Sequence, residues 1–217
     1  CYKYNNSSIK QQLIDLIRQK GGKRESELEE EASKELYKTL SEKYKKVFPR
    51  GTPFVCVCEK GRVEDVEGLI RGARAAGMDV TAMVSELGTD GYDNSWTPLM
   101  IAALYEHSTI IEILLQCNAD TATTDNDGSN ALHYAALNNK TTTTIVQLLL
   151  NNMKLEDLNH KTTNGDTPLD RCYKYNNSSI KQQLIDLIRQ KGGKRESELE
   201  EEASKELYKT LSEKYKK

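Results

Sequence analysis

The feature that most constrains the fold is a pattern of paired helices that recurs about every 33 residues across residues 47–193. Residues 96–120 align with residues 129–152, because their Leu and Ala positions coincide after this step. Weaker copies begin near Gly51 and Gly165. A fixed period of this length is typical of solenoids, whose units bury their apolar faces only by stacking on neighbours.

Each copy has the same order of elements. In three copies a Pro stands at the expected first turn of a short helix, where its missing N–H costs no hydrogen bond. A small pair such as Ala102-Ala103 follows, and after a polar break a second helix carries apolar residues at helical spacing, such as Ile110, Ile111 and Leu114. The pattern predicts an all-α solenoid of about four helix-pair units with long flanking helices. The expected units are residues 47–95, 96–128, 129–162 and 163–193.

Two units carry a recognisable motif. One has Asp125, Gly128, Leu132, His133, Ala135 and Ala136, and the other has Thr97, Pro98, Leu99, Ala102 and Ala103. They resemble the ankyrin repeat, whose motif runs Asp-x-x-Gly-x-Thr-Pro-Leu-His-x-Ala-Ala, although Asn130-Ala131 replace Thr-Pro and Met100 replaces the His. The resemblance implies that His133 hydrogen-bonds a neighbouring repeat and that His107, at the helix break, is also structural. The end units depart most, as capping repeats do.

Proteins with this resemblance bind other proteins through their hairpin tips and the exposed side of their first helices. Carried onto this chain, the resemblance predicts a partner-binding set. The tip residues are Asp93, Asn94, Trp96, Asn126, Asp127, Ser129, Asn164 and Asp166, and the first-helix residues are Leu104, Tyr105, Leu137 and Asn138. Trp96 and Tyr105 are the expected anchors, because aromatic residues dominate interface hot spots. A core position for Trp96 is an equal alternative.

Residues 71–95 lie between the first two units, where the step is about 12 residues longer than the regular one and so contains an insertion. We expect it to lengthen the end of a second helix or the loop that follows. Drift of a tolerated loop is the favoured interpretation. The alternative is a binding finger that carries Tyr92, Asp93 and Asn94.

The chain also contains one segment twice, because residues 1–46 and 172–217 are identical. In the second copy, Ser178-Ser179 are expected to cap the second helix of the last unit, and Gly192-Gly193 to end it. The amphipathic helix that follows, 194–217, has an apolar residue at every fourth position: Leu199, Ala203, Leu207, Leu211 and Tyr215. We expect it to pack on the end of the solenoid, with a coiled-coil seam or a partner helix as alternatives.

The first copy is predicted to form two helices and to pack on the first repeat, with a domain swap into another chain as the alternative. The face that it must cover comprises Ile9, Leu13, Ile14, Leu16 and Ile17. The duplication has two interpretations: an engineered or artefactual copy, which we favour, or a window on a tandem array with a period of 171 residues.

Charge is distributed unevenly. Residues 47–171 hold 9 Lys+Arg and 17 Asp+Glu, a net charge of −8, whereas each copy of the duplicated segment carries +3. An acidic middle argues against nucleic acid as a partner, because phosphate affinity needs clustered Lys and Arg. It suits a basic protein partner or simply solubility. No apolar run approaches the roughly 18 residues that a membrane helix needs.

The four distinct cysteine positions are too few for a disulfide scaffold. We expect reduced thiols in the cytoplasm or nucleus. Cys56 and Cys58 invite a zinc interpretation, but the three histidines supply no second ligand pair, so small core cysteines are favoured. We expect no metal or cofactor, and no Gly-rich phosphate loop or nucleophile elbow is present.

These observations favour a non-enzymatic protein-interaction module or scaffold. One alternative is an engineered or duplicated chain that acts as a conformational switch or a domain-swapped assembly. Another is the targeting fragment of a larger enzyme, which the lack of an initiating Met allows. The sequence does not identify the partner.

Overall fold

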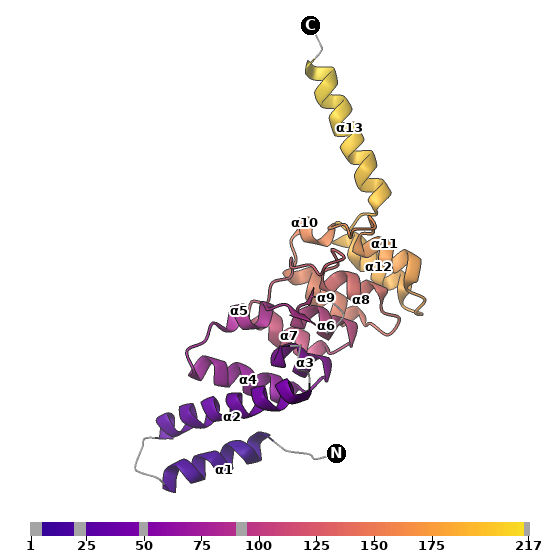
Figure 1. Ribbon diagram of the computed structural model, residues 1–217. Coiled ribbons are helices and arrows are strands. Elements are labelled where there is room, and N and C mark those ends of the chain that lie inside the picture. Colours follow the sequence, from indigo (N-terminus) through magenta and orange to yellow (C-terminus); the bar gives the residue numbers. More distant parts are fainter. Residues whose placement is uncertain (1–5, 20–24, 48–51, 90–94, 215–217) are drawn as a thin grey trace. The chain divides into compact units, whose positions relative to one another are not determined.

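The computed structural model describes residues 6–19, 25–47, 52–89 and 95–214. Almost every element in these ranges is a helix, as the all-α prediction required (Figure 1). The two strands described, β1 (Gly88–Thr89) and β2 (Ser95–Trp96), form one short antiparallel pair. The chain divides into two compact units, Cys1–Thr123 (unit 1) and Thr124–Lys217 (unit 2).

The four predicted helix pairs are confirmed, two in each unit. In unit 1, first helices contact first helices and second helices contact second helices between the two repeats. The same arrangement joins the two repeats of unit 2. In chain order the pairs are α3 (Pro53–Glu59) with α4 (Val63–Ala75), α6 (Pro98–Leu104) with α7 (Ser108–Gln116), α8 (Ala131–Leu137) with α9 (Thr143–Asn152), and α11 (Pro168–Tyr175) with α12 (Lys181–Gln190).

Each first helix begins with the same local device. A Thr or Asn in extended conformation precedes the helix, and its side-chain oxygen accepts a hydrogen bond from a backbone N–H of the first turn. Thr97 accepts from Met100 N at 3.2 Å, and Thr167 accepts from Asp170 N at 3.2 Å. The expected Pro stands at the first helical position in three of these helices.

The first copy of the duplicated segment forms α1 (Asn6–Gln19) and α2 (Glu25–Val47), and α2 packs along α4. Packing on the first repeat is therefore confirmed, but α2 makes most of that contact and α1 lies chiefly against α2. On α1, Ile14 is buried, Leu13 and Ile17 are half-buried, and Leu16 is 50% exposed. The Ile9 side chain lies outside those described.

The insertion lengthens both the helix and the loop, as expected. Helix α4 has 13 residues where α7 has 9, and α5 (Val80–Ser85) follows it before β1 begins. Tyr92, Asp93 and Asn94 lie outside the described residues, so the binding-finger interpretation stays a prediction.

Unit 2 ends with α10 (Leu155–Leu158), the fourth helix pair and α13 (Glu196–Lys214). The Ser cap predicted for α12 is wrong. This helix begins at Lys181 without a side-chain cap, and Ser178 instead donates its hydroxyl hydrogen to Asn176 Oδ1 at 2.6 Å. Asn176 is buried, and its side-chain amide is satisfied there because it donates to the Ala136 and Asn138 carbonyls at 3.0 Å each.

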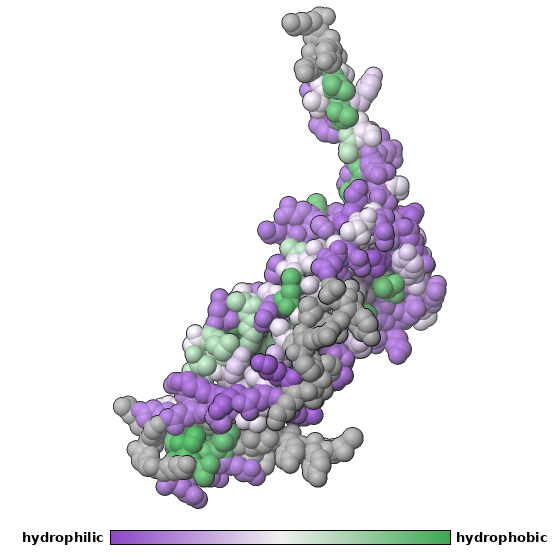
Figure 2. All heavy atoms as spheres, in the orientation of Figure 1, coloured by the Kyte–Doolittle hydropathy of each residue, from purple (hydrophilic) through white to green (hydrophobic). Residues whose placement is uncertain are grey.

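The prediction that the last helix packs on the end of the solenoid is also wrong. The side chains of Leu207, Tyr208 and Leu211 on α13 are 61%, 77% and 44% exposed. The first turn of α13 is tied to the fourth repeat, since Glu196 N–H donates to Asp170 Oδ2 at 2.8 Å. The rest of the helix exposes its apolar residues to solvent (Figure 2).

Candidate partner-binding surface

The two hairpin tips of unit 2 are held by backbone hydrogen bonds. Asp125 N–H donates to Ser129 O at 3.0 Å, and Thr162 N–H donates to Asp166 O at 3.0 Å. A further bond joins the tips, because Thr163 N–H donates to Asp127 O at 2.9 Å. Each tip therefore has a fixed backbone, and the third and fourth repeats fix one another.

Three of the predicted tip residues present their side chains to solvent. Asn126, Asp127 and Asn164 are exposed. At Asp127 the backbone N–H donates to Asp125 Oδ1 at 2.9 Å, so the main chain is held while the carboxylate faces water. This arrangement presents the side chains of both tips from rigid positions.

Two other predicted tip residues are corrected by the structure. Ser129 is 2% exposed and Asp166 is 3% exposed, so neither offers its side chain to a partner. The Ser129 hydroxyl accepts from Arg171 Nη2 at 3.3 Å. The Asp166 carboxylate forms ion pairs with Lys174 and, at 3.7 Å, with Arg171 Nε. Both residues stabilise the turns that they belong to.

In unit 1, Tyr105 is the most exposed of the predicted anchors. Its ring is 47% exposed and stacks on His107 with ring centroids 6.3 Å apart. His107 is fixed in turn, since its Nε2 lies 3.1 Å from the Glu59 carbonyl oxygen of the first repeat. Tyr105 therefore stacks on a ring that an inter-repeat hydrogen bond holds in place. Leu104 and Trp96 are both half-buried, so Trp96 is neither a full core residue nor a fully exposed one.

The first-helix residues of the third repeat are less available than expected. Leu137, the last residue of α8, and Asn138, its C-cap, are both half-buried. The Asn138 carbonyl accepts the Asn176 side chain, as described above. Leu137 can contribute apolar area to an interface, whereas Asn138 already helps to hold Asn176 of the fourth repeat in place.

The structural roles predicted for the two motif histidines are confirmed. His133 is fully buried, with Nδ1 3.2 Å from Asn130 N and Nε2 3.2 Å from the Asp166 carbonyl of the next repeat. Burial lowers the pKa of His133 to about 3, which keeps the ring neutral. A neutral ring that accepts at Nδ1 and donates at Nε2 satisfies both contacts. His160 is exposed.

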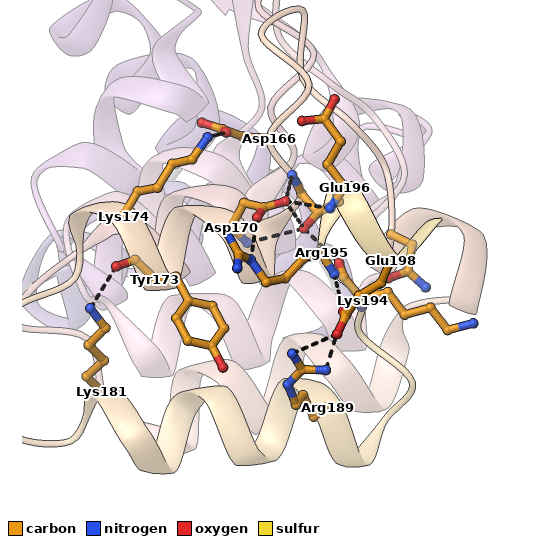
Figure 3. A network of polar contacts seen from close by, with 12 residues as sticks. Asp166, Asp170, Tyr173, Lys174, Lys181, Arg189, Lys194, Arg195, Glu196 and Glu198 are labelled. Carbon is orange, nitrogen blue, oxygen red and sulfur yellow. Dashed lines mark hydrogen bonds and ion pairs between the residues drawn. The ribbon is translucent and has the colours of Figure 1, made fainter. Parts of the chain in front are cut away.

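A polar network at the end of unit 2 was not predicted (Figure 3). Asp170 occupies the motif position of His133 and accepts from Arg195 Nε at 2.9 Å. Burial raises the pKa of Asp170, but hydrogen bonds from Glu196 N–H and Arg195 outweigh it and leave that pKa below its ordinary value. The substitution of Asp for the motif His was the available clue, because a buried acid there requires a cationic partner.

The cysteines behave as core residues. Cys56, Cys58, Cys117 and Cys172 are buried free thiols. Burial raises the pKa of Cys56 to about 11 and raises that of Cys58 further, so both remain protonated at neutral pH. Within the described ranges, no group of His, Cys, Asp and Glu side chains is arranged to hold a metal ion. None of the described helices is both long and apolar enough to cross a membrane.

A comparison with protein-family models gives one result that matches this geometry. A model of three consecutive ankyrin repeats matches residues 58–154 and again residues 99–192. Together these matches cover more than half of the chain and include the second helix of the first repeat and all helix pairs after it. Ankyrin repeats are generally protein–protein interaction modules. The chain belongs to the ankyrin repeat family.

Proposed function

We propose that this chain binds a protein partner through its hairpin tips and the exposed sides of its first helices. The observation that carries the proposal is the rigid presentation of exposed side chains. In unit 2, Asn126, Asp127 and Asn164 project from tips whose backbones are already hydrogen-bonded. In unit 1, Tyr105 is held over His107. Pre-organised side chains lose little conformational entropy on binding, so more of their contact energy appears as affinity.

The proposed partner presents basic side chains near the tips of unit 2. The net charge of the repeats overstates their acidity toward a partner, because Asp65, Asp125, Asp166 and Asp170 are buried within the protein. Asp127 is different, since its carboxylate is exposed at a fixed tip. We therefore assign the electrostatic part of recognition to Asp127 and the apolar part to Tyr105 and Leu137. The buried free thiols fit a protein that works in a reducing, intracellular compartment.

Charge reversal at matched positions tests this assignment. Proteins captured from a lysate by the wild-type chain would be compared with those captured by Asp127→Lys, Tyr105→Ala and Glu156→Lys. Glu156 is an exposed acid on α10 that is not one of the proposed contact residues, and its reversal changes the net charge equally. We expect Asp127→Lys and Tyr105→Ala each to reduce capture of a specific partner at least about tenfold, as hot-spot truncations do. Equal retention by all three variants would refute the proposed surface.

A further inference from the structure

One helix sequence lies in two different environments in this protein. The 19 residues of α13 are identical to residues 25–43 of α2. In α2 the apolar stripe is buried: Leu28, Leu36 and Leu40 are 2%, 2% and 3% exposed, and Ala32 is 0% exposed. In α13 the residues equivalent to Leu36 and Leu40 are Leu207 and Leu211, which are 61% and 44% exposed. The apolar stripe that α2 buries is therefore left uncovered on α13 (Figure 2).

Helix α4 is shaped to receive this particular helix sequence. A Cβ atom on Gly72 would lie 2.4 Å from Tyr37 Cβ and 2.5 Å from the Ser33 carbonyl oxygen, so only glycine permits the observed approach. The residues that make this contact recur in α13 as Ser204 and Tyr208. The surface of α4 is thus complementary to α13 as well as to α2.

A buried acid adds a polar contact to the α2–α4 pair. Asp65 on α4 is 0% exposed, and its Oδ2 accepts the Tyr44 hydroxyl hydrogen at 2.5 Å. The same oxygen pairs with Lys43 Nζ at 3.6 Å and with Arg62 Nε at 2.9 Å. The Lys-Tyr pair of α2 also recurs, as Lys214-Tyr215 in the duplicated sequence. The C-terminal copy therefore contains every α2 residue that these apolar and polar contacts use.

We propose that α13 docks on α4 of a second copy of this chain, in the place that α2 occupies there. The contact is heterologous: the C-terminal helix of one chain meets the first repeat of the next, so it adds chains head to tail. The proposal is independent of the partner-binding surface above, because it uses neither the hairpin tips nor Tyr105.

The tether of α2 explains when this docking occurs. Residues 48–51 join α2 to the first repeat, and a short tether holds a ligand at its site with an effective concentration of about 1 mM. A free α13 at micromolar concentration is therefore outcompeted by α2 of the same sequence. Head-to-tail docking requires that α2 be released or that chain concentrations approach the effective concentration of the tether.

Two complementary full-length proteins test the proposal. The donor is the wild-type chain, which keeps α13 intact and has α4 covered by its own α2. The acceptor is the double variant Leu36→Asp, Leu207→Asp, in which a charge releases α2 from α4 and the same change disables α13. We expect each protein alone to sediment as a monomer at micromolar concentration. The mixture should give a 1:1 complex with twice the monomer mass.

The control replaces the donor with the single variant Leu207→Asp, which should leave the mixture monomeric. Adding Gly72→Leu to the acceptor should also abolish the complex. A mixture of wild type and acceptor that stays monomeric, while the acceptor keeps its helical circular dichroism, would overturn the proposal. Self-association of the wild type that Leu207→Asp abolishes, without binding to the acceptor, would overturn it too, because α13 would then pair with α13.

A milder acceptor covers the case in which Leu36→Asp unfolds unit 1. Tyr44→Ala weakens the hold of α2 on α4, because it removes a buried ring and the hydrogen bond to Asp65, but it places no charge in the apolar stripe. It is again combined with Leu207→Asp. The same 1:1 complex with the wild-type donor is expected. Its absence with this folded acceptor would overturn the proposal equally.

Discussion

Leu36→Ala and Leu207→Ala make the same chemical change at equivalent positions of two identical helices, and we expect very different costs. Local sequence and helix propensity are matched, so they cancel in the comparison. Leu36 is 2% exposed, on the buried face of α2, so its truncation should lower the free energy of unfolding by about 2–5 kcal/mol. Leu207 is 61% exposed, and its truncation should cost about 1 kcal/mol or less.

The single tryptophan makes the measurement specific. Trp96 lies in unit 1, so its fluorescence reports the unfolding of that unit in urea. With a slope of about 1–3 kcal/mol per molar urea, Leu36→Ala should lower the fluorescence midpoint by about 1 M or more. Leu207→Ala should leave this midpoint in place. Equal shifts for the two variants, or an unchanged midpoint in Leu36→Ala, would refute the burial argument for α2.

Two further predictions concern His133 and Gly61. Because burial holds the pKa of His133 near 3 in the folded protein, against 6.5 for the free side chain, the unfolded state binds the extra proton as pH falls below about 6.5. The free energy of unfolding of unit 2, measured by urea titration, should therefore fall by about 2 kcal/mol between pH 7 and pH 5. The variant His133→Gln should remove this pH dependence, whereas His160→Gln should keep it. Gly61 has φ +66° and its missing Cβ would lie 2.4 Å from the His107 ring, whereas Gly77 has φ +70° and open space. Gly77→Ala should cost about 1–2 kcal/mol from backbone strain alone, and Gly61→Ala should lower the thermal midpoint by more than this matched control does.

The helix pairs could be predicted because their determinants are local. Thr97-Pro98 and Thr167-Pro168 start helices whatever surrounds them, and small residues such as Ala102 mark where helices must approach closely. The tip residues were harder to predict. Ser129 and Asp166 have the composition of exposed turns, but Arg171 and Lys174 from α11 turn them inward, and that contact depends on how the repeats stack.

The flanking helices show where prediction from sequence stops. α2 and α13 have the same residues, so no rule based on pattern or propensity can assign burial to one and exposure to the other. The difference arises from what precedes and follows them. α13 is attached by its first turn to Asp170 of the fourth repeat, whereas α2 leads directly into the repeat whose second helix it covers.

The bonds between the third and fourth repeats also determine how unit 2 opens. Several hydrogen bonds cross that boundary, among them Thr163 to Asp127, His133 to Asp166, Arg171 to Ser129, and Asn176 to Ala136 and Asn138. Three of these bonds satisfy buried side chains, those of Ser129, His133 and Asn176, and a buried polar group left without its partner costs about 1–3 kcal/mol. Partial opening at this boundary is therefore disfavoured. The two repeats form one cooperative element, whose amide hydrogens exchange with solvent together rather than fraying from the fourth repeat inward.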